Sequence, residues 1–159
     1  MQYANAGTGA TDASAEGGGG GFVRTGLDVL GKIWNAPNTA IGLLYAGVGR
    51  LFGGDFSIGN NGIQLENSPL QRSGYAVTLG NVIVYGGGQA TPQAYGPHES
   101  QHTIQGQVLG PLYLPANLIG MGASLISAPF TGVSPRGILF GPANFMEAGP
   151  YSTPPRPWP

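Results

Sequence analysis

The residues best able to do chemistry lie in one short segment. The chain has only two histidines, His98 and His102, and Glu99 directly follows the first of them. On a helix, residues four positions apart project from the same face. Two imidazoles in that register can bind one zinc ion at about 2.0–2.1 Å, and the glutamate between them can contact a zinc-bound water. The segment therefore matches H-E-x-x-H, a pattern typical of zinc hydrolases.

A catalytic zinc usually has three protein ligands and one open position, so the motif predicts a third ligand elsewhere. The chain has no cysteine and no further histidine, so this ligand must be an acid. Glu147 is the only acidic residue after His102 and lies in a predicted short helix over 142–148. We therefore expect His98, His102 and Glu147 to bind Zn²⁺. The acids before the motif remain alternatives: Asp12, Glu16, Asp28, Asp55 and Glu66.

Zinc held in this way would lower the pKa of its bound water from about 15.7 toward 7. Glu99 would accept the proton as the water attacks a carbonyl, and would pass it to the leaving amine. Tyr113 and Tyr151 lie near the ligands in sequence and are candidate donors to the oxyanion, with Tyr95 and Arg156 also eligible. A role in packing or at the surface is the alternative for each of these four.

Metal ligands are usually held in orientation by further hydrogen bonds, so we expect a second set of contacts around them. Asn144 lies one helical turn before Glu147, and Gln101 or Gln105 could contact the other nitrogen of a ligand histidine. The alternative reading of the whole segment is a polar helix face, with Glu99 favoured near the helix N-terminus by the dipole alone.

Composition excludes one class of partner. Charged residues make up 8% of the 159 residues, the net charge is −1, and the six basic residues are scattered. No basic patch is available for a nucleic-acid backbone, so we expect no nucleic-acid partner. The lack of cysteine excludes disulfides and thiolate ligands.

The pattern of apolar residues predicts an α+β fold. We expect a small antiparallel β-sheet or hairpin packed on several helices, one of which carries the motif. Periodicity and capping residues predict helices over 26–34, 40–52 and 97–110, and strands over 63–66 and 75–85, the last bent at Gly80-Asn81. Strands in the 75–85 region are our candidates for binding an extended peptide by β-augmentation.

Residues 112–130 form the least charged stretch, since no charged residue occurs between Glu99 and Arg136. At nineteen residues it is almost long enough to cross a bilayer, but prolines, glycines and serines dilute it. No basic residues flank it as anchors. We therefore expect a buried core helix, and membrane association is the alternative that the sequence does not favour.

The ends of the chain differ from the middle in composition. Residues 1–21 are rich in glycine, alanine, serine and threonine and lack the features of a Sec signal peptide, so we expect a flexible leader. Residues 22–151 form the expected catalytic domain, and residues 152–159 form a proline-rich tail that is extended against the surface or loose.

The segments His98–Gln105, Leu109–Pro115 and Asn144–Glu147 together resemble a group of small bacterial proteins with the pattern HExxHxxQ…LGPxYLP…NxxE. That group is similar to minimal zincins of the gluzincin type, whose ligands are two histidines and a downstream glutamate. The resemblance covers roughly residues 37–151 and implies a zincin-like fold and a zinc metallopeptidase that cleaves a peptide or protein substrate.

Similar domains occur in bacterial polymorphic and secretion-system toxins. The resemblance therefore also implies a secreted effector, delivered by a dedicated secretion system, with an immunity or secretion partner. A membrane-associating or interaction module with a structural zinc site is the alternative function.

Overall fold

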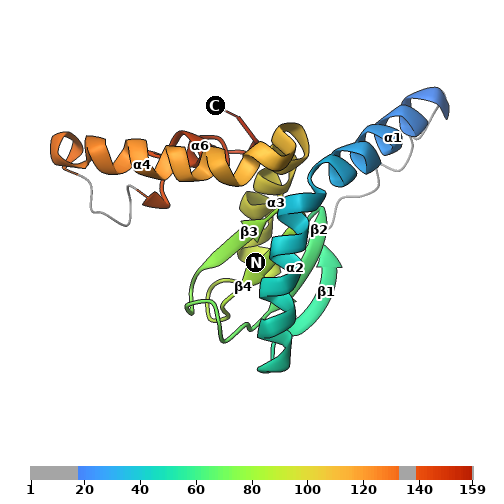
Figure 1. Ribbon diagram of the computed structural model, residues 1–159, viewed down its shortest axis with the longest axis horizontal. Coiled ribbons are helices and arrows are strands. Elements are labelled where there is room, and N and C mark those ends of the chain that lie inside the picture. The colour runs from blue at the N-terminus through green and yellow to red at the C-terminus, as the bar shows by residue number, and fades with distance from the viewer. Residues whose placement is uncertain (1–17, 133–138, 159) are drawn as a thin grey trace, which may run out of the picture.

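The computed structural model describes residues 18–132 and 139–158, and it confirms the α+β class (Figure 1). A four-stranded sheet lies between two helices, α2 (Ala36–Leu51) and α3 (Pro92–Leu109). Two further helices, α1 (Gly18–Trp34) and α4 (Tyr113–Thr131), project away from these layers in different directions (Figure 1).

The sheet consists of two hairpins joined side by side. Strands β1 (Asp55–Gly59) and β2 (Gly62–Glu66) form one, and β3 (Ala76–Leu79) and β4 (Val82–Tyr85) form the other. Both hairpins are antiparallel, as expected, but the strand order β1-β2-β4-β3 makes the central β2–β4 pair parallel. The sheet is therefore mixed, because the chain after β2 crosses to the far edge before β3 and returns through β4.

The hairpin turns follow from their residues. Asn60 and Asn61 both have positive φ, 48° and 65°, as a two-residue type I′ turn requires. Gly80 has φ of 66° and is followed by Asn81, so the bend predicted at this dipeptide is the two-residue turn between β3 and β4.

Alternation along the strands divides the sheet into two faces. One face packs against α2, where Leu65, Val82 and Val84 form a core with Ala46 of the helix. The other face carries Thr78, which contacts α3 through Glu99. The sheet therefore presents β3 directly to the helix that carries the histidine motif.

The motif helix is longer than predicted. We expected it to begin at Pro97, but α3 begins at Pro92, where the side chain of Thr91 caps it by accepting from the N–H of Ala94 at 3.2 Å. Proline is favoured at the first helical position, and here Pro92 occupies that position. Pro97 lies inside the helix, where its cost is one missing backbone hydrogen bond.

The first two helices also extend beyond their predicted starts. Helix α1 begins at Gly18, inside the predicted leader, since glycine weakens a helix without forbidding it. The rest of that leader, residues 1–17, lies outside the described part of the chain. Helix α2 begins at Ala36 rather than Ala40, with Pro37 in its first turn.

The expectation of a buried core helix over 112–130 is wrong. Residues Gly110–Leu112 form a short 3-10 helix, η1, and α4 follows it with most of its large apolar side chains exposed. The sequence shows that this stretch is apolar, but apolar residues are buried only where another element covers them. Among the described elements, α4 contacts only η1, α3 and the short helix α6 (Phe145–Ala148) extensively.

The proline-rich tail lies against the body of the protein. The side-chain amide of Gln105 in α3 donates to the carbonyl of Pro157 at 2.6 Å. The backbone N–H of Arg156 donates to the carbonyl of Gly149 at 3.2 Å. Of the two alternatives for the tail, the structure has the one in which it is packed on the surface.

Candidate metal centre

The motif residues lie on the face of α3 that turns toward the sheet and α6. His102 and Glu99 are buried, and the side chain of His98 is 18% exposed. Helix geometry accounts for the shared direction of the two imidazoles, because residues four positions apart lie one above the other. The local sequence therefore positions two of the three members of the site.

Glu147 reaches the same point from α6. Asn144 caps this short helix, with its side chain accepting from the N–H of Met146 at 3.0 Å. Helix α6 in turn packs on α4, where the hydroxyl of Ser124 is shared between the carbonyls of Gly120 at 2.8 Å and Ala143 at 3.2 Å. Asn144 thus acts on the site by fixing the backbone of Glu147.

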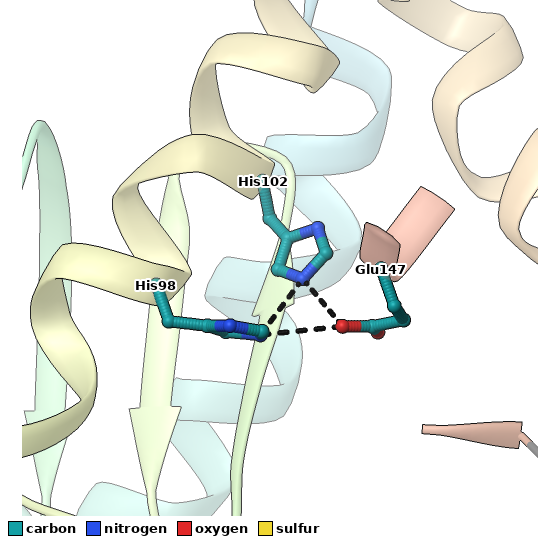
Figure 2. A group of neighbouring side chains, drawn as sticks. All are labelled: His98, His102 and Glu147. Carbon is teal, nitrogen blue, oxygen red and sulfur yellow. Dashed lines mark hydrogen bonds and ion pairs between the residues drawn. The ribbon is translucent and has the colours of Figure 1, made fainter. Parts of the chain in front are cut away.

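The three side chains converge on one point (Figure 2). The Nε2 atoms of His98 and His102 are 3.2 Å apart, and each lies 3.2 Å from Oε2 of Glu147. Within the described part of the chain, this is the one group of three or more His, Asp or Glu side chains close enough to hold a metal.

These distances fit a tetrahedral zinc site. Zinc with ligands at about 2.0–2.1 Å requires ligand atoms about 3.3–3.4 Å apart, close to the observed separations of 3.2 Å. Hydrogen bonds explain the arrangement less well. Each of the three contacts among the two imidazole nitrogens and the carboxylate oxygen would need a proton between its two atoms. A single cation at their centre satisfies all three atoms at once.

The partner of the other nitrogen sets the tautomer of His102. Its Nδ1 lies 2.8 Å from Oε1 of Gln105. The amide nitrogen of Gln105 donates to the carbonyls of Met146 at 2.8 Å and Pro157 at 2.6 Å, so the amide oxygen faces the histidine. An amide oxygen can only accept, so Nδ1 carries a proton, and in the neutral imidazole Nε2 presents its lone pair to the cluster. This is the tautomer that a metal ligand needs.

Charges within the metal-free cluster stabilise one another. Burial lowers the pKa of His102, but the hydrogen bond and the negative charge of Glu147 outweigh burial and raise that pKa from 6.5 to about 9. Burial raises the pKa of Glu147, but hydrogen bonds and charge interactions with His102 and His98 lower it from 4.5 to about 2. In the absence of a metal, a proton shared within this group therefore takes the place of a cation.

Glu99 is held beside the cluster by the sheet. Its carboxylate is buried, and the hydroxyl of Thr78 in β3 donates to Oε2 at 2.6 Å. Glu147 and Glu99 line one cleft with the two histidines. Glu99 lies outside the group of three converging side chains, as expected of a residue that would contact a metal-bound water.

The cluster opens into a cleft of about 1000 Å³. The edge strand β3 forms one wall, from Tyr75 to Leu79, and α4 forms another with Leu114, Asn117, Leu118 and Met121. Because the β3–β4 hairpin closes on the pair Leu79–Val82, alternation directs the backbone groups of Ala76 and Thr78 away from β4. The strand predicted to bind peptides is thus a sheet edge beside the cluster.

Both predicted tyrosines line this cleft. Tyr113 is 2% exposed, and its hydroxyl lies 3.5 Å from the carbonyl of Thr78. The ring of Tyr151 packs edge-on against His98, with centroids 4.5 Å apart, and its hydroxyl donates to the carbonyl of Phe140 at 3.0 Å. Burial, then the charges of Glu147 and Glu99, raise the pKa of Tyr151. It therefore keeps its proton at neutral pH and can donate a hydrogen bond.

The remaining candidates are distributed around the site. Tyr95 lines the cleft, whereas Arg156 is exposed in the tail and does not. Gln101 bonds the carbonyl of Pro97 and the hydroxyl of Ser100, so Gln105 is the one of the two glutamines that contacts a histidine of the cluster.

The upstream acids within the described residues lie elsewhere. Asp28 pairs with Lys32 at 2.7 Å, Asp55 lies 3.7 Å from Arg50, and Glu66 accepts from Ser57 at 2.7 Å. Asp12 and Glu16 lie outside the described part of the chain.

Two contacts of the site have no signal in the sequence. Thr78 lies in a strand of ordinary composition, and only its packing against α3 brings its hydroxyl to Glu99. Pro157 lies in a tail whose composition predicts no fixed position, but its carbonyl is bound to the same glutamine that orients His102.

Comparison of the chain with protein-family models, with curated proteins and with solved structures found no match.

Proposed function

We propose that this protein is a zinc-dependent hydrolase, and specifically a metallopeptidase. The observation that supports this most directly is the convergence of His98, His102 and Glu147 at mutual distances of 3.2 Å, with Glu99 buried beside them. A structural zinc site is usually closed by four protein ligands, whereas a catalytic site has three and keeps one position open. Three ligands facing a large cleft fit the second kind.

The chemistry divides between the ion and the chain. Zinc, when bound, would supply an activated water and polarise the carbonyl of the substrate. Glu99 accepts a proton from the water as the water oxygen attacks the carbonyl carbon. When the carbon–nitrogen bond breaks, the same proton passes to the leaving amine. The hydrogen bond from Thr78 holds one carboxylate oxygen and leaves the other to make these transfers.

The cleft supports a peptide as the substrate. The outward backbone groups of Ala76 and Thr78 in β3 can pair with an extended chain, which would then run past the cluster. Tyr113 and Tyr151 line the cleft and are the candidate donors to the developing oxyanion. Each hydroxyl bonds a backbone carbonyl, Thr78 for Tyr113 and Phe140 for Tyr151, and would exchange that acceptor for the oxyanion.

Metal analysis and paired variants test the proposal. The purified protein should contain about one zinc per chain, which His98→Ala should remove. Glu99→Gln should keep the zinc and lose hydrolysis of labelled casein and of a mixture of quenched fluorescent peptides. Gln101→Ala is the matched control, since this residue shares α3 but bonds only Pro97 and Ser100.

The results separate the proposal from its alternative. Hydrolysis that persists in Glu99→Gln at the wild-type rate contradicts the proposed mechanism. Stoichiometric zinc in a wild-type protein that cleaves none of the peptides indicates a structural zinc site in an interaction module. If the protein is also a secreted effector, its expression should be toxic to bacteria, and Glu99→Gln should remove the toxicity.

A further inference from the structure

Most of the large apolar residues of helix α4 face outward, the reverse of the usual arrangement. The face that packs against the protein carries the small or polar residues Gly120, Ser124 and Asn117 beside the larger Tyr113 and Met121. The outward face carries large apolar side chains: Leu118, Ile119, Leu125, Ile126 and Phe130, which are between 47% and 88% exposed. A helix at the surface of a water-soluble domain places its apolar stripe inward. Small residues inward and large apolar residues outward are typical of helices in contact with lipid.

Three polar side chains of α4 donate hydrogen bonds within the protein. Ser124 donates to the carbonyl of Gly120 at 2.8 Å, Ser127 donates to the carbonyl of Ser124 at 2.8 Å, and Asn117 donates to the carbonyl of Tyr113 at 3.1 Å. Such local bonds reduce the need of these side chains for water. The outward face of α4 therefore offers hydrocarbon almost exclusively.

The size and charge of α4 match the same environment. Its nineteen residues extend about 28 Å, against about 30 Å for the hydrocarbon core of a bilayer. Within the described residues, one helical stretch, Pro92–Phe130, is long and apolar enough by length and composition to cross a membrane. Its most apolar window has a mean hydropathy of 1.3, and only 22% of that window is buried. A core helix of a soluble protein would be mostly buried.

The other projecting helix agrees with this environment. Helix α1 exposes Leu27, Leu30 and Trp34, and its charged residues Arg24, Asp28 and Lys32 lie on a different face. Such a helix is typical of the interface between lipid and water. Figure 1 shows α1 and α4 extending from the end of the sheet layers opposite the C-terminal end of α2.

We propose that the outward face of α4 lies in the hydrocarbon of a lipid bilayer. The absence of charge on this face favours lipid over a soluble protein partner, whose interface has a polar rim. Leu118 belongs both to the outward face and to the wall of the cleft, so the cleft opens beside the lipid. Taken with the proposed function, this placement favours peptide segments at or in a membrane as substrates.

The test uses the full chain and vesicles of neutral phosphatidylcholine, because the proposed contact involves no charge. The wild-type protein should float with the vesicles at both low and high salt. Ile126→Arg should reduce the bound fraction roughly tenfold or more. Leu51→Arg is the matched control, since this side chain is equally large, is 83% exposed and is the last residue of α2, whose C-terminal end lies away from α1 and α4 (Figure 1). It should leave binding unchanged.

A second measurement keeps the proposal testable if a charged variant folds poorly. The chain has no cysteine, so Ile126→Cys and Leu51→Cys can each be labelled with one environment-sensitive fluorophore. The label at position 126 should shift to the blue when vesicles are added, and the label at position 51 should not.

Two outcomes would overturn the proposal. One is a monomer that neither floats nor shows the shift at position 126. The other is a lipid-free dimer in which the label at 126 is already shielded, which would assign the face to a second copy of the chain. His98→Ala should lose zinc and still float, so failure of the metal site and failure of membrane binding are separate results.

Discussion

The bond between Gln105 and His102 provides the sharpest test of the metal site. Replacing Gln105 by leucine keeps most of the buried volume but removes the acceptor of the Nδ1 proton of His102. Losing such a partner of a metal-binding histidine typically weakens metal affinity about 10–100-fold. We therefore expect the zinc dissociation constant of Gln105→Leu to rise by that factor, equivalent to about 1.4–2.7 kcal/mol.

The same substitution has a second effect that does not involve zinc. It leaves the carbonyls of Met146 and Pro157 without their donor, in addition to the Nδ1–H of His102. Each buried group without a partner costs about 1–3 kcal/mol. The free energy of unfolding of the zinc-free protein should therefore fall by roughly 3 kcal/mol or more. Denaturant titration in the presence of a chelator measures this loss.

Two further variants separate these effects. Gln105→Glu restores an acceptor for the Nδ1–H but places a carboxylate against two carbonyls. It should bind zinc at least as tightly as the wild type and still be less stable. Gln107→Leu, on the same helix and bonded only weakly to Asn81 at 3.3 Å, is the control for zinc affinity. Competition with a chromogenic chelator measures the affinities. If Gln105→Leu bound zinc within twofold of Gln107→Leu, His102 would not be a ligand oriented in this way.

Three other outcomes are expected. Thr78→Val should lower kcat by about tenfold and leave the zinc content unchanged, because Glu99 loses the hydrogen bond that orients it. In steady-state assays, a change in KM alone would contradict this role. In the zinc-free protein, Glu147 stabilises the fold above pH 4.5, and this contribution is lost as the pH falls through about 2. His102 stabilises the fold below pH 6.5, and this contribution is lost as the pH rises through about 9. Stability of the chelated protein should therefore be greatest between pH 4.5 and 6.5, as urea titrations across pH would show, and Glu147→Gln should flatten the profile. At a free zinc concentration 100 times the zinc dissociation constant, bound zinc should add about 2.7 kcal/mol to the free energy of unfolding. Removing the zinc should therefore lower Tm by roughly 5–10 °C in scanning calorimetry, and an unchanged Tm is the contrary result.

The sequence predicted the parts of this protein that depend on local geometry. The register of His98 and His102 follows from helix periodicity, and the strands and turns around Gly80-Asn81 follow from β-branched residues and turn chemistry. Glu147 could be chosen as the third metal ligand because the chain has few acidic residues. Elimination among so few candidates does not require knowing how far each lies from the histidines. These inferences depend on neighbours within a few positions, or on composition.

Tertiary packing decided what the sequence could not. Thr78 contacts Glu99 because β3 is the edge strand beside α3, and Gln105 bonds the tail because residues 139–158 fold back over the motif helix. The burial predicted for 112–130 was wrong for the same reason. Apolar composition shows that a helix avoids water, but whether protein or another phase covers it depends on which elements the rest of the chain places against it.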